Sequence, residues 1–487
     1  MTKVLITHSY FYKFDPKQWR FKQPYPPLGT LQAAAVIRQM GFEASLFDSN
    51  LKKGPEQFRE AIQRHPAKYV VIYDDGFNYL TKMCLTNMRQ AAFSMAKMAK
   101  IQGCVVIVCS SDATDHYEKY FPHGVDFVIR GEGEETLREL LPALEKRMDV
   151  STLPGLIYKK QGNTVVTPSR KVLTALDSLP LAAWDLVDIK PYKRIWKKYH
   201  GYFSLNIATT RGCPFKCNWC AKPIYGNRYN SRSPENVVQE IEMLIHLYQP
   251  DHFWICDDIF GLKPGWVSEF RDLILNKKLK FKYKIQSRAD LLLEEKTINA
   301  LAESGVETVW IGAESGSQKI LDAMDKGISV GQIRQATQLL RAKKLKIGFF
   351  LQFGYLGENL QDIEATIQMV LELMPDDLGI SVSYPLPGTK FYDKVKGQLR
   401  EKENWSDSDD LAMMFQSTFN KEYYRLLHRY VHSIYRNKKG YNNLKKILRR
   451  PLTLTYKELR SLFSMFYYFP ATFSQRARLK KLETAQQ

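Results

Sequence analysis

Hydrophobic and polar positions follow two different periods along the first part of the chain. Short runs of β-branched and aromatic residues occur at 4–7, 44–48, 69–74, 104–111 and 127–131. Segments with the period of an amphipathic helix lie between them, over residues 28–40 and 84–100. Apolar strands joined by helices are typical of a parallel sheet covered on both faces. The pattern predicts a doubly wound α/β domain over residues 1–140, with ligands at the carboxyl ends of its strands.

Residues 141–199 interrupt this alternation. The stretch LIYKKQGNTVVTP, with Gln161-Gly162-Asn163 in the middle, indicates a β-hairpin. The stretch DSLPLAAWDLVD, which contains Pro180, is typical of an irregular connector. We therefore expect a hairpin and a connector between two domains.

A second alternation of strands and helices fills residues 200–395. Its six apolar runs are FSLNIATT, HFWICDD, YKIQSR, TVWIGAES, IGFFLQFGY and LGISVSYP. The helix after the first run has Ser233 as N-cap and Pro234 at its first position. Because a closed barrel has eight such units, six of them predict a partial, open-sided (β/α)6 barrel with its chemistry at the C-terminal mouth of the strands.

The positive charge of the chain is concentrated in its last part. The 487 residues have a net charge of +20, and residues 421–487 contribute 16 of the 71 Lys and Arg residues but only three of the 51 acids. Residues 396–487 read as helices rich in aromatic and basic side chains. Such helices can close the open barrel, lie on an anionic membrane, or bind single-stranded nucleic acid. The remainder, residues 1–420, is only mildly basic with a net charge of +7, which argues against a nucleic-acid-binding protein.

The seven cysteines are not spaced as a disulfide framework. Their number is odd, and three of them fall within eight residues. The N-terminus lacks the apolar segment of a signal peptide, and the apolar stretch 462–473 is short and contains Pro470. We expect a reduced, cytoplasmic protein without a transmembrane helix.

The three clustered cysteines are Cys213, Cys217 and Cys220, in a loop directly after the first barrel strand. Thiolates at this density are ligands for zinc or for an iron–sulfur cluster. A zinc site would need a distant fourth ligand such as Cys256 or a histidine. A cubane cluster held by three cysteines instead leaves one iron open for a substrate or cofactor.

This Cys-x3-Cys-x2-Cys motif at the start of a six-unit β/α array resembles the radical S-adenosylmethionine (radical SAM) superfamily over residues 200–390. The resemblance implies a 4Fe-4S cluster, held by the three cysteines, that cleaves S-adenosylmethionine reductively to form a 5′-deoxyadenosyl radical. It also implies contacts to S-adenosylmethionine from polar and aromatic residues at the strand ends. These are Trp219, Asp257, Asp258, Arg288, Glu314 and Ser315.

The first 140 residues resemble the Rossmann-like cobalamin-binding domain that precedes the barrel in one radical SAM class. Residues 24–50, the strand end at 108–112 and the stretch 129–140 carry this resemblance. The implied cobalamin contacts are Pro27, Leu28, Gly29, Ser110, Ser111, Gly131, Glu132 and Gly133. No Asp-x-His-x-x-Gly motif supplies a histidine below cobalt, because His116 and His123 lack its spacing. A Rossmann-like domain with a structural role or another ligand is the alternative.

The combined resemblance implies a cobalamin-dependent enzyme that methylates an unactivated carbon of a small or lipid-like substrate. An oxidative cyclase of the anaerobic magnesium-protoporphyrin ester cyclase type has the same domain order, and a non-catalytic cobalamin or metal sensor could use the same first domain. The implied partners are an electron donor such as flavodoxin or ferredoxin and, through the basic tail, the surface of a membrane. ATP and NAD are not expected, because neither a P-loop nor a Gly-x-Gly-x-x-Gly motif is present.

Overall fold

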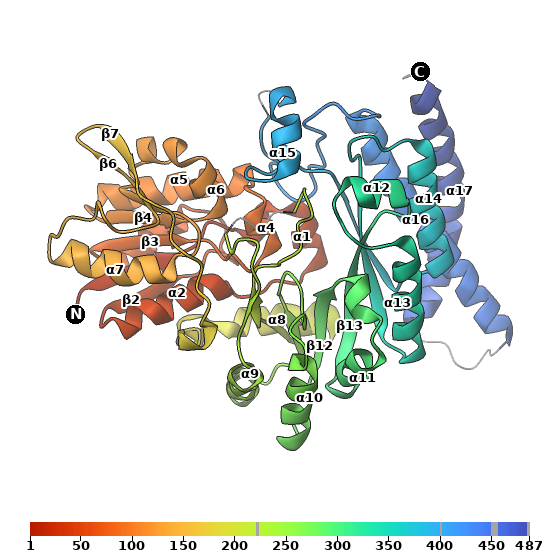
Figure 1. The fold of residues 1–487 in the computed structure, drawn as a ribbon, viewed down its shortest axis with the longest axis horizontal. Coiled ribbons are helices and arrows are strands. Elements are labelled where there is room, and N and C mark those ends of the chain that lie inside the picture. Colours follow the sequence, from red (N-terminus) through yellow and green to blue (C-terminus); the bar gives the residue numbers. More distant parts are fainter. Residues whose placement is uncertain (221–223, 400–401, 450–455, 485–487) are drawn as a thin grey trace.

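The first part of the molecule is built on a seven-stranded sheet in the order β2-β1-β3-β4-β5-β6-β7 (Figure 1). Strands β1 to β5 are parallel, and β6 and β7 add an antiparallel hairpin to the edge of β5. The strands are β1 (Lys3–Thr7), β2 (Glu43–Phe47), β3 (Tyr69–Tyr73), β4 (Val105–Cys109), β5 (Phe127–Ile129), β6 (Leu156–Lys160) and β7 (Asn163–Val166). The computed structural model describes residues 1–220, 224–399, 402–449 and 456–484.

Helices cover both faces of this sheet, which confirms the doubly wound arrangement. One core joins the side chains of α2 and α7 to one face of β1, and a second core joins those of α3 and α5 to the other face. Alternate residues of β1 therefore point into different cores. The helices are α1 (Pro16–Phe21), α2 (Leu28–Gln39), α3 (Gln57–Arg64), α4 (Tyr79–Lys82), α5 (Thr86–Ile101), α6 (Ser111–Asp115) and α7 (Glu134–Glu145).

The hairpin that the sequence indicates between the two domains belongs to the first sheet. Residues Gln161 and Gly162 both have positive φ at its turn, as a tight two-residue connection requires. The hairpin covers the edge of β5, which would otherwise present unpaired backbone groups. The sheet thus continues to Val166, beyond the expected boundary at residue 140. Helix α8 (Ile189–His200) then leads to the barrel.

The second sheet has six parallel strands in the order β15-β14-β13-β12-β11-β8, which confirms the partial barrel. Helix α9 begins as expected, with the Ser233 side chain accepting a hydrogen bond from the Asn236 amide. The strands are β8 (Ser204–Ile207), β11 (His252–Ile255), β12 (Lys282–Ser287), β13 (Val306–Glu314), β14 (Lys346–Phe353) and β15 (Asp377–Val382). The helices are α9 (Pro234–Tyr248), α10 (Trp266–Asn276), α11 (Glu295–Glu303), α12 (Gln318–Ala323), α13 (Val330–Ala342), α14 (Leu360–Leu373) and α15 (Lys390–Val395).

Both open edges of this barrel are covered by other parts of the chain. At the β8 edge, the Asn206 amide group donates to the carbonyl oxygen of Pro26, and the Tyr25 hydroxyl lies 3.1 Å from that of Ser204. At the β15 edge lies α16 (Lys421–Arg449), whose Tyr435 hydroxyl donates to a loop carbonyl beside the strand. The first domain and the tail therefore do what two further β/α units do in a closed barrel.

The tail is a pair of long helices, α16 and α17 (Tyr456–Thr484), which pack along each other (Figure 1). The aromatic side chains of α16 that face the barrel are buried, namely Tyr423, Tyr424, Tyr430 and Tyr435. Helix α16 therefore closes the open barrel, which is one of the three roles that the sequence allowed for the tail. In the described part of the chain, no helix combines the length and the apolar character needed to cross a membrane.

We predict that Gly348→Ala destabilises the barrel. Gly348 lies opposite Trp310 in the β13–β14 pair, and a Cβ atom there would be only 2.4 Å from the indole ring. Trp310 cannot easily move away, because it stacks on Phe350 with ring centroids 4.6 Å apart. The free energy of unfolding should fall by about 1–3 kcal/mol in urea titrations. Gly331→Ala, where the nearest atom would be 3.6 Å away, should cost nothing, and equal losses would refute this account.

Candidate functional site

The three cysteines lie on a long loop whose two ends are held together. Strands β9 (Thr210–Arg211) and β10 (Asn230–Ser231) pair antiparallel and close the loop at its base. Gly212 follows with a φ of +79°, and a Cβ atom there would lie 2.1 Å from the Arg228 carbonyl oxygen. Only glycine fits this position, because both the backbone conformation and the space exclude a side chain.

Asn218, between the second and third cysteines, fixes the tip of the loop to the opposite side of the barrel. Its backbone N–H donates to the Met324 carbonyl at 3.0 Å, and its side-chain NH2 group donates to the Ala323 carbonyl at 2.8 Å. The Tyr355 hydroxyl donates to its side-chain oxygen at 2.6 Å. Sequence reasoning missed Asn218 and Tyr355, because nothing local to either residue reveals that they meet.

The cysteines share a loop and donor chemistry but not a closed ligand arrangement. None of the three forms a disulfide, and each is partly exposed. Among the described residues, no three His, Cys, Asp or Glu side chains converge closely enough to hold a metal ion. Three soft sulfur donors on one partly exposed loop nevertheless fit an iron–sulfur cluster, and they do not complete a four-ligand zinc site.

Two cations lie beside Cys217. The Arg288 guanidinium is 3.9 Å from its Sγ, stacks over the Phe215 ring and pairs with Asp290 at 3.0 Å. Buried Lys326, whose charge interacts with that of Cys217, pairs with buried Glu314 at 2.8 Å. Burial lowers the pKa of Lys326, but the charges of Glu314 and Cys217 outweigh it and hold the pKa above its ordinary value. The Cys217 sulfur thus lies in a positive environment.

Three predicted residues therefore lie at the cysteine loop. Arg288 contacts Cys217, and Lys326 lies between Glu314 and Trp219. Glu314 has a φ of +57° at an irregularity in the β13–β14 pairing, a strained conformation that is common in binding sites. The Lys326 Nζ lies 6.0 Å from the centre of the Trp219 ring, whose buried Nε1 has no hydrogen-bond partner among the described residues. Lys326 itself was missed, because a lysine in a loop has no distinctive sequence signal.

The remaining three predicted S-adenosylmethionine contacts already have protein partners. The Ser315 hydroxyl is buried against that of Thr366 at 3.0 Å. Asp257 accepts hydrogen bonds from the amides of Thr209 at 2.7 Å and Thr210 at 3.0 Å. Asp258 pairs at 2.6 Å with Lys82 of α4, a residue of the first domain. Their roles toward a ligand stay predictions.

A buried ion-pair network joins the cysteine loop to the first domain. Arg211, two residues before Cys213, pairs with Glu132 at 3.0 Å and with Glu134 at 2.7 Å. Each of these three side chains is at least 93% buried. Burial raises the pKa of Glu132 above its ordinary value. At Glu134 the Arg211 guanidinium outweighs the effect of burial, so the pKa of that carboxyl is lowered. The implied cobalamin loop and the cysteine loop are thus in direct contact.

The other implied cobalamin contacts lie at the strand ends of the first domain. The Gly29 amide donates to Asp75, and Ser110 caps α6 through a hydrogen bond from Ala113. The Ser111 hydroxyl is buried and has no hydrogen-bond partner in the described part of the chain. Pro27 and Leu28 open α2, and Gly131 and Gly133 flank Glu132 after β5. Small residues and an unused hydroxyl at these ends fit a broad ligand at the sheet edge.

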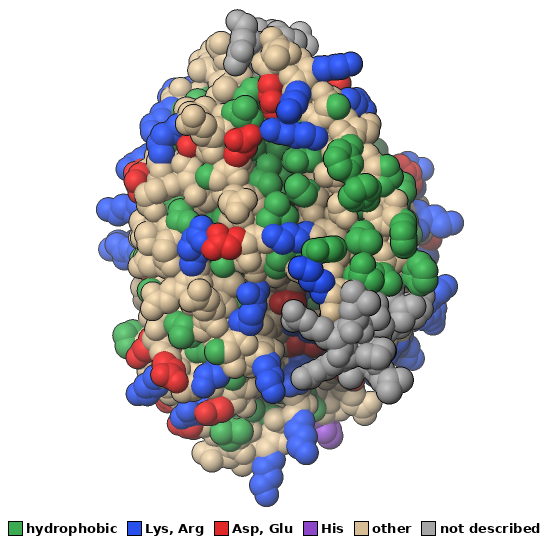
Figure 2. Space-filling model, turned by 90° about the vertical axis from the view of Figure 1, so that its right-hand side faces the viewer, with side chains coloured by type: hydrophobic (Ala, Val, Ile, Leu, Met, Phe, Trp, Pro, Cys, Tyr) green, Lys and Arg blue, Asp and Glu red, His purple; other side chains and the backbone are tan. Residues whose placement is uncertain are grey.

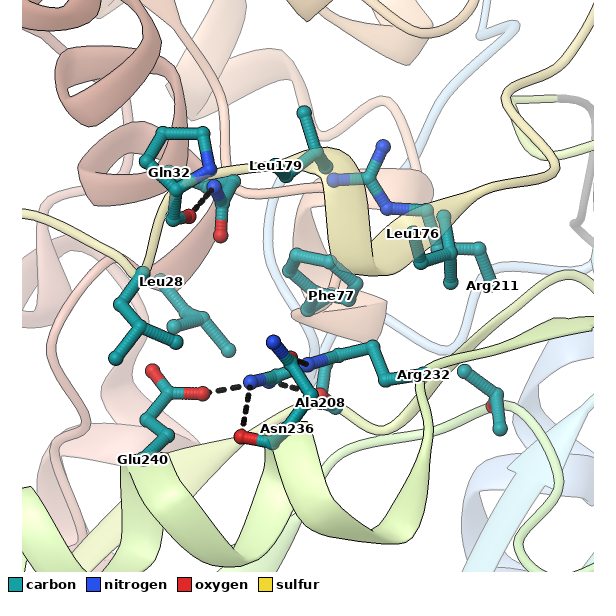
Figure 3. A pocket seen from close by; sticks show the side chains of 13 residues that line it. Leu28, Gln32, Phe77, Leu176, Leu179, Ala208, Arg211, Arg232, Asn236 and Glu240 are labelled. Carbon is teal, nitrogen blue, oxygen red and sulfur yellow. Dashed lines mark hydrogen bonds and ion pairs between the residues drawn. The ribbon is translucent and has the colours of Figure 1, made fainter.

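A small pocket lies behind Arg211, where the first domain, the connector and the barrel meet (Figure 3). Arg232 crosses it and pairs with Glu240 of α9, while Gln32 of α2 donates to the Pro180 carbonyl at 2.6 Å. These polar groups satisfy one another. The pocket, which Arg211 also lines, therefore marks the junction of the first domain, the connector and the barrel.

Comparison with known proteins defines the class. Residues 207–370 match the family model described as the radical SAM superfamily, and this range includes all three cysteines. The match covers the cysteine loop and most of the partial barrel. Its sequence is similar to an uncharacterized methyltransferase of Pyrococcus horikoshii, with 28% identity over 78% of this chain and 81% of that protein.

Two further relatives differ in the reaction that their names state. The anaerobic magnesium-protoporphyrin IX monomethyl ester cyclase of Synechocystis is 26% identical over 76% of this chain and 73% of its own length. The hopanoid C-3 methylase of Methylococcus capsulatus is 25% identical over 77% of this chain and 70% of its own length.

Solved structures share the whole arrangement of domains. The cobalamin-dependent radical enzyme OxsB, with aqua-cobalamin bound, has a TM-score of 0.72 and 17% identity and covers 99% of this chain and 72% of its own. The methyltransferase TsrM of Kitasatospora setae, with cobalamin and a [4Fe-4S] cluster bound, has a TM-score of 0.69 and 17% identity over 82% of this chain and 75% of its own. The fold is therefore that of cobalamin-dependent radical SAM enzymes.

We predict that Arg211→Met destabilises the contact between the two domains. The change leaves Glu132 and Glu134 buried without a cation, which should lower the free energy of unfolding by about 3–5 kcal/mol in urea titrations. The loss should shrink at acid pH, where the carboxyls are protonated. Arg20→Met, at an exposed ion pair with Asp409, is the control and should cost less than about 1 kcal/mol. Similar losses in both variants would contradict the proposed importance of the network.

We predict that Asp257→Asn flattens the pH dependence of stability. Burial raises the pKa of Asp257 from 3.8 to about 7. The folded protein therefore keeps a proton that the unfolded chain releases, so the contribution of Asp257 to stability is complete below about pH 4 and is lost as the pH rises to about 7. Removing the carboxyl should change the slope of the unfolding free energy against pH by up to about 1.4 kcal/mol per pH unit in this window.

An asparagine at this position can still accept hydrogen bonds from both backbone amides, because both of them go to one oxygen of Asp257. Unfolding of the apoprotein should be measured between pH 4 and 8. Asp185→Asn, at a carboxyl with 67% exposure, is the control and should keep the wild-type slope. An unchanged slope in Asp257→Asn would show that this carboxyl does not titrate in the window.

Proposed function

We propose that this chain is a cobalamin-dependent radical SAM enzyme that methylates an unactivated carbon of a small or lipid-like substrate. The observation that carries the proposal is the buried Arg211 network, which holds the three-cysteine loop directly against the strand ends of a cobalamin-type domain. Methyl transfer to carbon needs both cofactor sites to face one substrate. A loop and a domain joined by two buried ion pairs satisfy that need.

The residues at hand suit each of the three groups. Cys213, Cys217 and Cys220 would hold a 4Fe-4S cluster, and the unpartnered hydroxyl of Ser111 lies where cobalamin would approach the sheet. Trp219, with its unpartnered Nε1, would lie against S-adenosylmethionine. When bound, the cluster would supply the electron that cleaves S-adenosylmethionine, and cobalamin would carry the methyl group.

The protein's own contribution is positioning and electrostatics. Arg288 and Lys326 place positive charge beside Cys217, which suits the carboxylate of an amino-acid ligand. Their counter-ions Asp290 and Glu314 keep both cations fixed in place. Buried Asp257 would offer a carboxylate to an ammonium group once it loses its proton.

An oxidative cyclase is the second candidate, because the 26% identical relative from Synechocystis bears that name. The chain is also similar to named methyltransferases and a methylase over comparable lengths, which favours methylation. A non-catalytic cobalamin sensor would have no use for the cysteine loop. Mass spectrometry of extracts from cells with and without the protein separates the first two, since methylation adds one methyl group.

We also propose the partners of this chemistry. An electron donor such as flavodoxin or ferredoxin would reduce the cluster through its exposed side. We propose a cytoplasmic location and peripheral contact of the basic tail with a membrane. Relatives named for hopanoid and tryptophan substrates make a small-molecule substrate the natural expectation.

We predict that Cys217→Ala abolishes both cluster reconstitution and the formation of 5′-deoxyadenosine from S-adenosylmethionine under anaerobic reduction. The same variant should keep the corrin absorbance that the wild type gains from hydroxocobalamin, because its first domain is intact. Cys104→Ala, at a buried cysteine outside the loop, is the control and should keep all three properties. A Cys217→Ala protein that still forms 5′-deoxyadenosine would refute the assigned loop, and a wild type without corrin absorbance would refute the first domain's assigned role.

A further inference from the structure

The outer face of α17 carries the densest group of exposed aromatic side chains among the described residues. Phe463, Phe466, Tyr467, Phe469 and Phe473 are 55–72% exposed, and we call them the aromatic face. Four of them recur at the spacing of one helix face, and Phe469 stands at its margin. The other exposed large apolar residues are scattered over the molecule. Figure 2 shows hydrophobic side chains gathered on this side of the molecule, with Lys and Arg beside them.

The aromatic face is exposed although α17 is firmly docked. Leu479 is completely buried, and Arg476 pairs with Glu364 of α14 at 3.1 Å. Arg436 of α16 donates to the Tyr468 hydroxyl and lies 5.1 Å from the centre of its ring. These inner contacts fix the rotation of the helix, so the aromatic face cannot turn inward without breaking them.

The charges around the aromatic face select the partner. Between Arg460 and Leu482 the chain has no Asp or Glu, and no Lys or Arg lies between residues 461 and 475. The cations stand at the two ends of the face, namely Arg460 before it and Arg478, Lys480 and Lys481 after it, whereas Arg476 is paired with Glu364 on the inner side. An uncharged aromatic centre with cations at both ends matches the surface of an anionic bilayer.

Two other occupants fit less well. A second copy of the chain would bring the cationic ends of one helix against the cationic ends of the other, in either orientation, and like charges repel. Single-stranded nucleic acid needs phosphate contacts between successive stacked bases, and the aromatic segment 461–475 has no cation to supply them.

We infer that the outer face of α17 docks the enzyme onto membranes that contain anionic phospholipids. The aromatic rings enter the headgroup region, and the basic ends contact lipid phosphates. Because no described helix can span a bilayer, the helix lies along the surface. The inference rests on the proposed membrane contact and assigns that contact to α17. The buried tyrosines of α16, from Tyr423 to Tyr435, pack against the barrel instead. It does not depend on the proposed chemistry.

Flotation of the full-length, reconstituted protein tests this inference. The wild type should float with vesicles of phosphatidylcholine and phosphatidylglycerol, and much less with phosphatidylcholine alone. Phe463→Ser/Phe466→Ser/Phe473→Ser should lower the partition coefficient about tenfold or more. Lys480→Gln/Lys481→Gln should lower it roughly thirtyfold on anionic vesicles and leave it unchanged on neutral ones. Phe21→Ser/Tyr199→Ser, at two exposed aromatic residues elsewhere, is the matched control and should float like the wild type.

Three results would overturn the inference. The first is a wild type that stays at the bottom of the gradient, and the second is a triple serine variant that floats normally. The third is a wild type that sediments as a dimer without vesicles while the triple serine variant sediments as a monomer. Melting temperatures and 5′-deoxyadenosine formation are measured on the same samples. Both should be unchanged in all variants, so that a failed flotation leaves the proposed chemistry standing, and a failed reaction leaves the docking surface standing.

Discussion

The arrangement of the whole molecule depends on one buried arginine. Arg211 stands two residues before the first cysteine and lies between Glu132 and Glu134 of the first domain. Because unpaired charges are very costly at such depth, the three groups can be buried only together, which fixes the cysteine loop against the carboxyl ends of the first sheet. The segment that carries the cysteines and the loop after β5 therefore stay together as one buried contact.

A partial barrel makes this contact possible and also creates a difficulty. Six strands leave two open edges, and the chain covers each edge with a different device. The segment at Tyr25 and Pro26 lies along β8, and α16 lies along β15. The first domain thus closes the barrel and supplies half of the candidate site, so the stability of the barrel and the geometry of the site rest on the same interface.

The tail divides its aromatic residues between two tasks. Four tyrosines of α16, from Tyr423 to Tyr435, are buried against the barrel. Five aromatic side chains of α17 face solvent on a helix that Arg436 and Arg476 hold in place. Exposure of so many rings on a fixed face weakens solubility, and a surface that binds them offsets that cost. The basic residues at its ends then favour an anionic partner.

The sequence by itself determined the two β/α repeats and the cysteine motif, because periodicity and local spacing are properties of neighbouring residues. The resemblance also implied that Arg288 and Glu314 lie near the cysteines, which agrees with the rule that the carboxyl ends of parallel strands share one mouth. The sequence could not find Lys326, Asn218 or the partners of Arg211, nor that the hairpin joins the first sheet. It could not separate α17 from α16 either. Those features were decided only by the tertiary structure, because burial and pairing between distant segments depend on how the domains pack, and no local pattern records that.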